Sequence, residues 1–311
     1  MVVQLFWKIM SMALMMAMGI ILVKSGIAKS QDSKPLSMLS VYLIMPCVVF
    51  KSFQVDFTPD VQRGLLLALI GAVAAELLLI LLNEPAKRLL RLDPIEQASV
   101  IYTNAGNLII PLVSSVIGPQ YVIYTTMFIA VERVLMFSHG IHLLRGEKKT
   151  DWKAILLNNN IICIVIGIVI MLTGFRFPAF MEDAIDSVAG MLGPMAMLIT
   201  GMLVGGMSFK KTFSSKRLWL TVGLRLLVMP VFCIVFLKYC GLTALFKDCS
   251  DVLIVTVLAC ITPSASTVTQ LSQVYTDHAD YAGAINVAST FLCILTMPCM
   301  AALYNALPAL W

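Results

Sequence analysis

Apolar residues gather into long segments that recur along the whole chain, and short polar stretches separate them. A helix needs about 20 apolar residues to cross a bilayer. The first segment, Leu5 to Ala28, has that length and exceeds the ~7–15 residue core of a signal peptide, so it is predicted to be a membrane helix. Nine more segments follow and give ten predicted spans: 36–53, 64–83, 97–117, 121–144, 154–174, 186–207, 218–239, 251–272 and 281–307.

The composition agrees with this pattern, because 59% of the 311 residues are hydrophobic and only 13% are charged. Such values are typical of polytopic membrane proteins. The segments between the spans are too short to fold as a separate soluble domain. We therefore expect an all-α protein that forms one membrane domain, with its function among the helices.

Lys and Arg residues are divided unequally between the two sides that alternate threading creates. One side has Lys51, Arg63, Arg176, Lys238 and Lys247, and the other has Lys29, Lys34, Lys87, Arg88, Arg91, Arg145, Lys148, Lys149, Lys153, Lys210, Lys211, Lys216 and Arg217. The richer side is predicted to be cytoplasmic, which places both termini outside the cytoplasm. This asymmetry accounts for the net charge of +5, so we expect a multi-pass protein of the cell membrane and no nucleic-acid partner.

The two halves of the chain show signs of a repeat. Three pairs of residues share an offset of 148 positions: Gly19 with Gly167, Gly26 with Gly174, and Pro46 with Pro194. Five spans in each half are an odd number, so the second copy enters the membrane from the opposite side. Residues 1–145 and 146–311 are thus predicted to be inverted five-helix repeats, as in many secondary transporters.

The fourth and ninth spans have polar residues and proline at their centres. Proline inside a helix costs about 3 kcal/mol or more, and freed backbone groups are tolerated only against protein or a watery cavity. Both helices are therefore predicted to break, with Thr262 as the N-cap of a new half-helix and Pro263 as its first residue. The candidate site residues are Asn104, Gly106, Asn107 and Pro111 in YTNAGNLIIPLV, and Thr262, Pro263, Ser264 and Ser266 in ACITPSASTVTQLS.

Such breaks favour a site for a small anion. Free N–H groups and the positive end of a helix dipole attract negative charge, and asparagine amides add donors without adding charge. The structural alternative is a kink whose polar groups bond to neighbouring helices. Two breaks at matching ranks of a repeat favour the site.

Four charged residues fall inside predicted spans: Glu76, Glu132, Arg133 and Arg225. Each costs about 2.5–3.5 kcal/mol there, so partners or a function are expected. They either form ion pairs that hold the helices together, or take part in transport. In the second case Glu76 or Glu132 takes up a proton, or an arginine meets a substrate carboxylate. Tyrosines near span ends, Tyr102 among them, are predicted to be interfacial anchors.

Together these features resemble the auxin efflux carrier family, within the superfamily that includes bile acid:sodium symporters. The resemblance covers essentially the whole chain and rests on the ten spans and on the motifs NAGNLIIP and TPSAST. It implies a scaffold of spans 1, 2, 6 and 7, which also forms a homodimer contact, and a transport domain of spans 3–5 and 8–10 that moves like an elevator. The two broken helices cross inside this transport domain.

The resemblance also implies the substrate class, because members carry auxin in plants and small mono- or dicarboxylates in bacteria. The short loop at 145–153 is typical of a bacterial-type member. By position, Asn104, Asn107 and Pro111 match the family's fourth-helix motif, and the ninth-helix motif is matched by Thr262, Pro263, Ser264 and Ser266. The sequence departs from the family pattern at Asn158, Asn159 and Asn160, where an Asn-Pro pair is common, and these either face the substrate or lie near the cytoplasmic end.

The predicted function is secondary transport, in the efflux direction, of a small organic anion within the lipid bilayer, with no cofactor. Coupling to a proton or sodium stays open. The alternative is a sodium-coupled, bile-acid-like symporter, in which Thr269 and Gln270 could bind sodium, although no acidic residue adjoins either break. An enzyme is not expected, because HExxH and GxSxG motifs are absent from the sequence. A channel or receptor with the same fold is not excluded.

Overall fold

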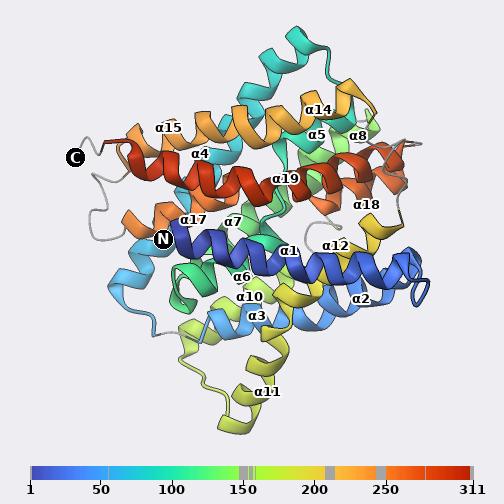
Figure 1. Ribbon diagram of the computed structural model, residues 1–311. Helices are drawn as coiled ribbons and strands as arrows, with labels where there is room; N and C mark the ends of the chain where they lie inside the picture. Colours follow the sequence, from blue (N-terminus) through green and yellow to red (C-terminus); the bar gives the residue numbers. More distant parts are fainter. Residues whose placement is uncertain are drawn as a thin grey trace.

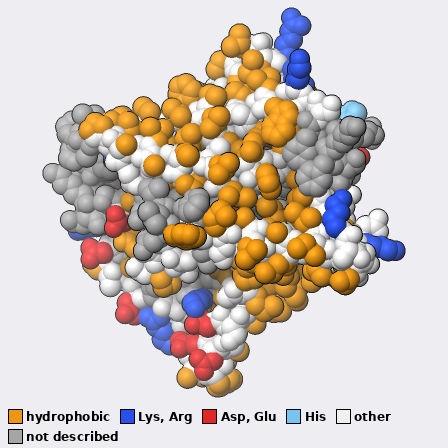
Figure 2. All heavy atoms as spheres, viewed as in Figure 1, with side chains coloured by type: hydrophobic (Ala, Val, Ile, Leu, Met, Phe, Trp, Pro, Cys, Tyr) orange, Lys and Arg blue, Asp and Glu red, His pale blue; other side chains and the backbone are white. Residues whose placement is uncertain are grey.

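The computed structural model describes residues 2–54, 56–146, 153, 157, 159–206, 214–242, 250–276 and 278–308. Within these ranges every regular element is a helix, and one isolated β-bridge is the exception. Six helical stretches there are long and apolar enough to cross a membrane, and shorter apolar helices accompany them. Apolar side chains cover much of the face in Figure 2, and the charged ones lie toward its edges. The prediction of a polytopic, all-helical membrane protein is confirmed at this level.

The helices pack into two groups. The first, called the α1 group, consists of α1 (Val2–Lys24), α2 (Ser33–Leu39), a π-helical turn η2 (Ser40–Ile44), α3 (Met45–Ser52), α10 (Asn159–Thr173), α11 (Ala179–Gly190) and α12 (Leu192–Gly205). Within it α1 packs along α12, and α3 packs against α10 and α11.

The second group, called the crossing group, holds the remaining long helices. It consists of α4 (Pro59–Leu90), α5 (Pro94–Ile101), α6 (Ala105–Val116), α7 (Val122–Leu135), α8 (Ile141–Arg145), α14 (Lys216–Gly223), the π-helical turn η5 (Leu224–Val228), α15 (Met229–Tyr239), α17 (Ser250–Cys260), α18 (Ser266–Tyr275) and α19 (Ala279–Ala306). Among the contacts between the groups are those of α1 with α6 and α19, of α12 with α6, and of α10 and α3 with α7. In Figure 1, α1 begins and α19 ends at the same end of the molecule.

Two of the predicted spans differ clearly from the observed helices, one in its length and one in its division. Helix α4 is longer than the predicted 64–83, because Thr58 caps its first turn by accepting from the N–H of Val61 at 3.3 Å. Pro85 lies within its last turns without ending it. The predicted span 186–207 is two helices, α11 and α12, which are separated at Met191.

Two of the three residue pairs at the offset of 148, the glycine pairs, lie in comparable surroundings. Gly26 and Gly174 both follow the end of a helix in the left-handed conformation, with φ of +78° and +65°. Gly19 and Gly167 both touch a neighbouring helix so closely that a Cβ atom would lie 2.4 Å from an atom of that neighbour. The inverted repeat itself stays a prediction.

Candidate functional site

The chain leaves the helical conformation twice near the middle of the crossing group. The first break, Tyr102–Asn104, separates α5 from α6, and the second, Ile261–Ala265, separates α17 from α18. Figure 1 shows α5 and α18 on one side of this point and α6 and α17 on the other. The two extended segments cross as an isolated antiparallel bridge between Thr103 and Ser264.

Backbone hydrogen bonds hold the crossing together. The N–H of Asn104 donates to the carbonyl of Pro263 at 2.9 Å, and the N–H of Ala265 donates to the carbonyl of Tyr102 at 3.1 Å. Each extended segment thus satisfies backbone groups of the other where both are buried. The prediction that both helices break is confirmed, and the breaks meet.

The predicted cap at Thr262 is wrong. Helix α18 begins at Ser266 after Ala265, while the hydroxyl of Thr262 donates back to the carbonyl of Ala259 at 2.8 Å. Thr262 therefore finishes α17 rather than starting α18. The reason is the crossing itself, because a helix that began at Pro263 could not leave Ser264 extended to form the bridge.

Pro111 does not break its helix either. It lies inside α6, while the break ends at Asn104, before the first residue of that helix. A Cβ atom at Gly193 of α12 would lie 3.0 Å from the Cβ of Pro111, so the two helices touch at this point. Pro111 thus belongs to the contact between the α1 group and the crossing group.

Side chains of α19 complete the crossing. The amide of Asn286 donates to the carbonyl of Ser264 at 2.6 Å, and the hydroxyl of Ser289 accepts from the N–H of Ser264 at 3.2 Å. Sequence reasoning missed both residues. The sequence pattern that could have identified them is a pair of polar residues one helical turn apart in a mainly apolar segment.

Glu132 of α7 fixes the first break. One of its carboxylate oxygens accepts from the backbone N–H and from the hydroxyl of Thr103, each at 2.6 Å. The other oxygen is buried without a hydrogen-bond partner. Both residues are buried, and Glu132 thus holds the extended segment from the side.

Arg225 lies at the C-terminal ends of two half-helices. It is fully buried, and its guanidinium donates to the carbonyls of Val100 and Ile101 at the end of α5. It also donates to the carbonyls of Cys260 and Thr262 at the end of α17. One side chain therefore serves backbone groups that both breaks leave without helical partners.

Glu76 is fully buried in α4, and neither of its carboxylate oxygens has a hydrogen-bond partner. No ion pair joins Glu76 to Arg225 in the part of the chain that the structure describes. The two residues come from equivalent ranks of the halves, but Arg225 uses its donors on carbonyls. The ion-pair interpretation thus finds no support at this pair.

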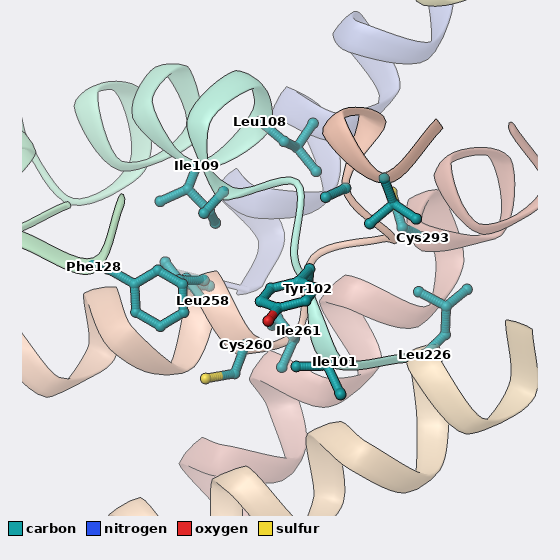
Figure 3. Close-up of a cluster of buried hydrophobic side chains, with 14 of the residues drawn as sticks. Ile101, Tyr102, Leu108, Ile109, Phe128, Leu226, Leu258, Cys260, Ile261 and Cys293 are labelled. Carbon is teal, nitrogen blue, oxygen red and sulfur yellow. The ribbon is translucent and has the colours of Figure 1, made fainter. Parts of the chain in front are cut away.

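The prediction that Tyr102 is an interfacial anchor, which rested on its place near a span end, is wrong. Tyr102 is fully buried, and its hydroxyl donates to the carbonyl of Leu135 at 3.0 Å. Figure 3 shows Tyr102 at the centre of an apolar cluster, with Phe128 on one side and Leu226 on the other. This cluster seals the crossing, so the crossing point itself is not open to a solute.

Arg133 of α7 lies where two half-helices begin. Its guanidinium donates to the hydroxyl of Thr267 at 2.6 Å, and a Cβ atom at Gly106 would lie 3.4 Å from its Nη2. Gly106 and Thr267 are each the second residue of their helix, α6 and α18. Arg133 thus adds a positive charge at two positive dipole ends. Its Nε is buried without a partner, and none of the ion pairs found in the described residues involves it.

A cavity of about 440 Å³ opens between the α1 group and the C-terminal half of α6. Pro111, Ser114 and Ser115 line it on one side, and Lys51 and Asp186 line it on the other. The ammonium of Lys51 lies 2.7 Å from the carboxylate of Asp186. The cavity is large enough for a small organic molecule and lies at the boundary between the two helix groups.

The remaining candidates are only partly described. Asn104 and Ser266 flank the crossing on either side, at the starts of α6 and α18. The amide oxygen of Asn159 lies 4.0 Å from the sulfur of Cys163 in the same helix. Asn158 and the side chains of Asn107, Asn160 and Gln270 lie outside the described residues.

Comparison with known proteins agrees with this architecture. No curated protein matches the chain. A family model described as membrane transport protein matches residues 5–301, almost the full length. The chain therefore belongs to this family of membrane transport proteins, the auxin efflux carrier family, and is a multi-pass membrane protein of the transporter class.

Proposed function

We propose that the protein is a secondary carrier for a small organic anion, a mono- or dicarboxylate, that binds beside the crossing of the broken helices. The observation that supports this most is the position of Arg133. A guanidinium and two helix N-termini meet at one place, and all three favour a negative group. A carboxylate there would offer planar acceptor oxygens that fit the guanidinium fork.

The cavity would supply the start of a route to this site, since α6 forms one of its walls. It follows the C-terminal half of α6, whereas Arg133 of α7 lies against Gly106 at the N-terminal end of α6. By the distribution of Lys and Arg, the end with Lys51 and Asp186 is extracytoplasmic. The crossing group would move past the α1 group as an elevator, which would close this opening and expose the site on the cytoplasmic side.

The finer architecture belongs to this proposal as well. Ten spans form two inverted five-helix repeats, with the α1 group as the scaffold and the crossing group as the transport domain. The scaffold would pair with that of a second copy in a homodimer. If the anion moves alone, an inside-negative potential favours its export by about 2.3 kcal/mol per charge per 100 mV, so efflux is the expected direction.

Ligand-induced thermal stabilisation of the purified protein tests the binding site. Malonate, malate, lactate and indole acetate are compared with their uncharged amides, and one or more carboxylates is expected to raise the unfolding temperature where its amide does not. Arg133→Gln should raise the apparent Kd about tenfold or more, because it removes a charge-assisted hydrogen bond.

Arg63→Gln is the matched control, because it makes the same change of charge on an exposed side chain at the start of α4. It is expected to leave the apparent Kd unchanged. Equal stabilisation by acids and amides, or an apparent Kd that Arg133→Gln does not alter, would contradict the proposed site.

A further inference from the structure

The breaks leave carbonyl groups that need a positive partner. A helix that ends inside the membrane has C-terminal carbonyls without helical donors, and its dipole is negative there. In transporters with discontinuous helices, such carbonyl ends bind a coupling cation, commonly sodium. Helices α5 and α17 both end in this way at the crossing.

In this protein the side chain of Arg225 occupies the position that such a cation would take. The Nη1 of Arg225 lies 3.1 Å from the carbonyl oxygen of Val100 and 3.3 Å from that of Ile101. Its Nη2 lies 2.9 Å from the carbonyl oxygen of Cys260, and both Nη2 and Nε reach Thr262, at 2.8 and 3.0 Å. All five hydrogen bonds end on backbone oxygens.

The position of Arg225 in the fold keeps its positive charge at the crossing. It is fully buried in the π-helical turn η5, between α14 and α15 of the crossing group. A guanidinium does not lose its proton in a protein. Its planar fork reaches two chain segments at once, which the single ammonium of lysine cannot do in the same geometry.

We infer that the guanidinium of Arg225 is a built-in substitute for a coupling cation at the crossing. It neutralises the ends of α5 and α17 and moves with the transport helices, so dissolved sodium has no place there and transport is independent of sodium. Arg225 is a positioning residue, because it acts on the half-helices and not on the solute. The transport part of this inference depends on the proposed function, but its effect on cation binding does not.

The first test measures the unfolding temperature of purified protein in sodium, guanidinium and choline chloride at equal, low concentration. The wild-type protein should unfold at the same temperature in sodium and choline. Arg225→Ala should unfold at a lower temperature and regain part of the loss in guanidinium or sodium, because the freed carbonyls then accept a dissolved cation. Arg133→Ala is the matched control and should gain no such response, since the described hydrogen bonds of Arg133 go to the hydroxyl of Thr267 and the sulfur of Met136 and not to carbonyls.

Stabilisation of the wild-type protein by sodium over choline would overturn the inference. So would an Arg225→Ala variant that folds and shows no response to either cation. If Arg225→Ala does not fold, Arg225→Lys replaces it, and partial stability with a new response to sodium is then the expected result.

The second test measures transport of the identified substrate into proteoliposomes in sodium or choline medium. Equal initial rates are expected for the wild-type protein. A rate about tenfold higher in sodium would overturn the inference and favour the symporter. If no substrate is transported, the proposed function fails, while the result of the unfolding experiment still decides the role of Arg225.

Discussion

At the residue scale, two arginines mark opposite electrostatic ends of the same pair of broken helices. Arg225 lies at the negative ends of α5 and α17, where its charge is compensated by carbonyl groups. Arg133 lies at the positive ends of α6 and α18, where its charge adds to the dipoles. The first arrangement is complete in itself. In the second, Glu132 is the neighbouring acid, but no carboxylate forms an ion pair with Arg133 within the described residues. We therefore place the solute at Arg133.

Glu132 is expected to be essential for the stability of the first break. Glu132→Ala leaves the N–H and the hydroxyl of Thr103 buried without an acceptor, at a cost of about 2 kcal/mol or more. Glu132→Gln keeps one acceptor oxygen and should cost less. Thermal unfolding of the purified protein measures both.

Glu84→Ala is the control for this pair, because Glu84 is exposed near the end of α4. It should not change the unfolding temperature. A Glu132→Ala variant as stable as the Glu84→Ala variant would show that the contact with Thr103 contributes nothing.

At the element scale, the contact between α1 and α12 depends on missing side chains. A Cβ atom at Gly201 would lie 2.0 Å from the carbonyl oxygen of Met16, so even alanine requires the two backbones to separate. Small residues allow this close approach, which is a common basis of helix packing in membranes.

Gly201→Ala is therefore expected to lower the free energy of unfolding by about 1–3 kcal/mol through overpacking. Gly223→Ala is the matched control, because nothing lies within 4 Å of its added Cβ, and it should be neutral or stabilising. The comparison is made by thermal unfolding in detergent. Equal stability of the two variants would contradict the observed packing of α1 on α12.

The sequence was sufficient for the class of the fold and for the presence of both breaks, because burial in lipid and the rules for proline act locally. It was insufficient for the positions of the breaks. Thr262 and Pro263 form a good local N-cap, but the bridge to Thr103 across the crossing overrides it. The role of Arg225 depends on carbonyls 35 and 125 positions away, which no local pattern reveals.

At the scale of the whole molecule, the proposed movement takes place between the two helix groups, and the cavity lies at their boundary. Ser114 lines the cavity on α6 and is exposed, whereas Thr126 of α7 is fully buried. In a chain without its native cysteines, Ser114→Cys should react with a membrane-impermeant thiol reagent added from the extracytoplasmic side.

A transported carboxylate should slow this labelling several-fold, because loading starts the movement that closes the cavity. Thr126→Cys is the control and should not react. Rapid labelling of both variants, or reaction of Ser114→Cys only from the cytoplasmic side, would contradict the proposed orientation and state.

Counterflow in proteoliposomes measures directly whether the protein carries out secondary transport of an organic anion. Vesicles with wild-type protein are loaded with unlabelled malonate, malate, lactate or indole acetate, and uptake of the same labelled compound is followed. We expect saturable uptake of at least one of these acids. The uptake should fall about tenfold or more in Arg133→Gln. Absence of exchange for every acid in a folded protein, or ion currents far above the turnover of a carrier, would contradict the proposed function.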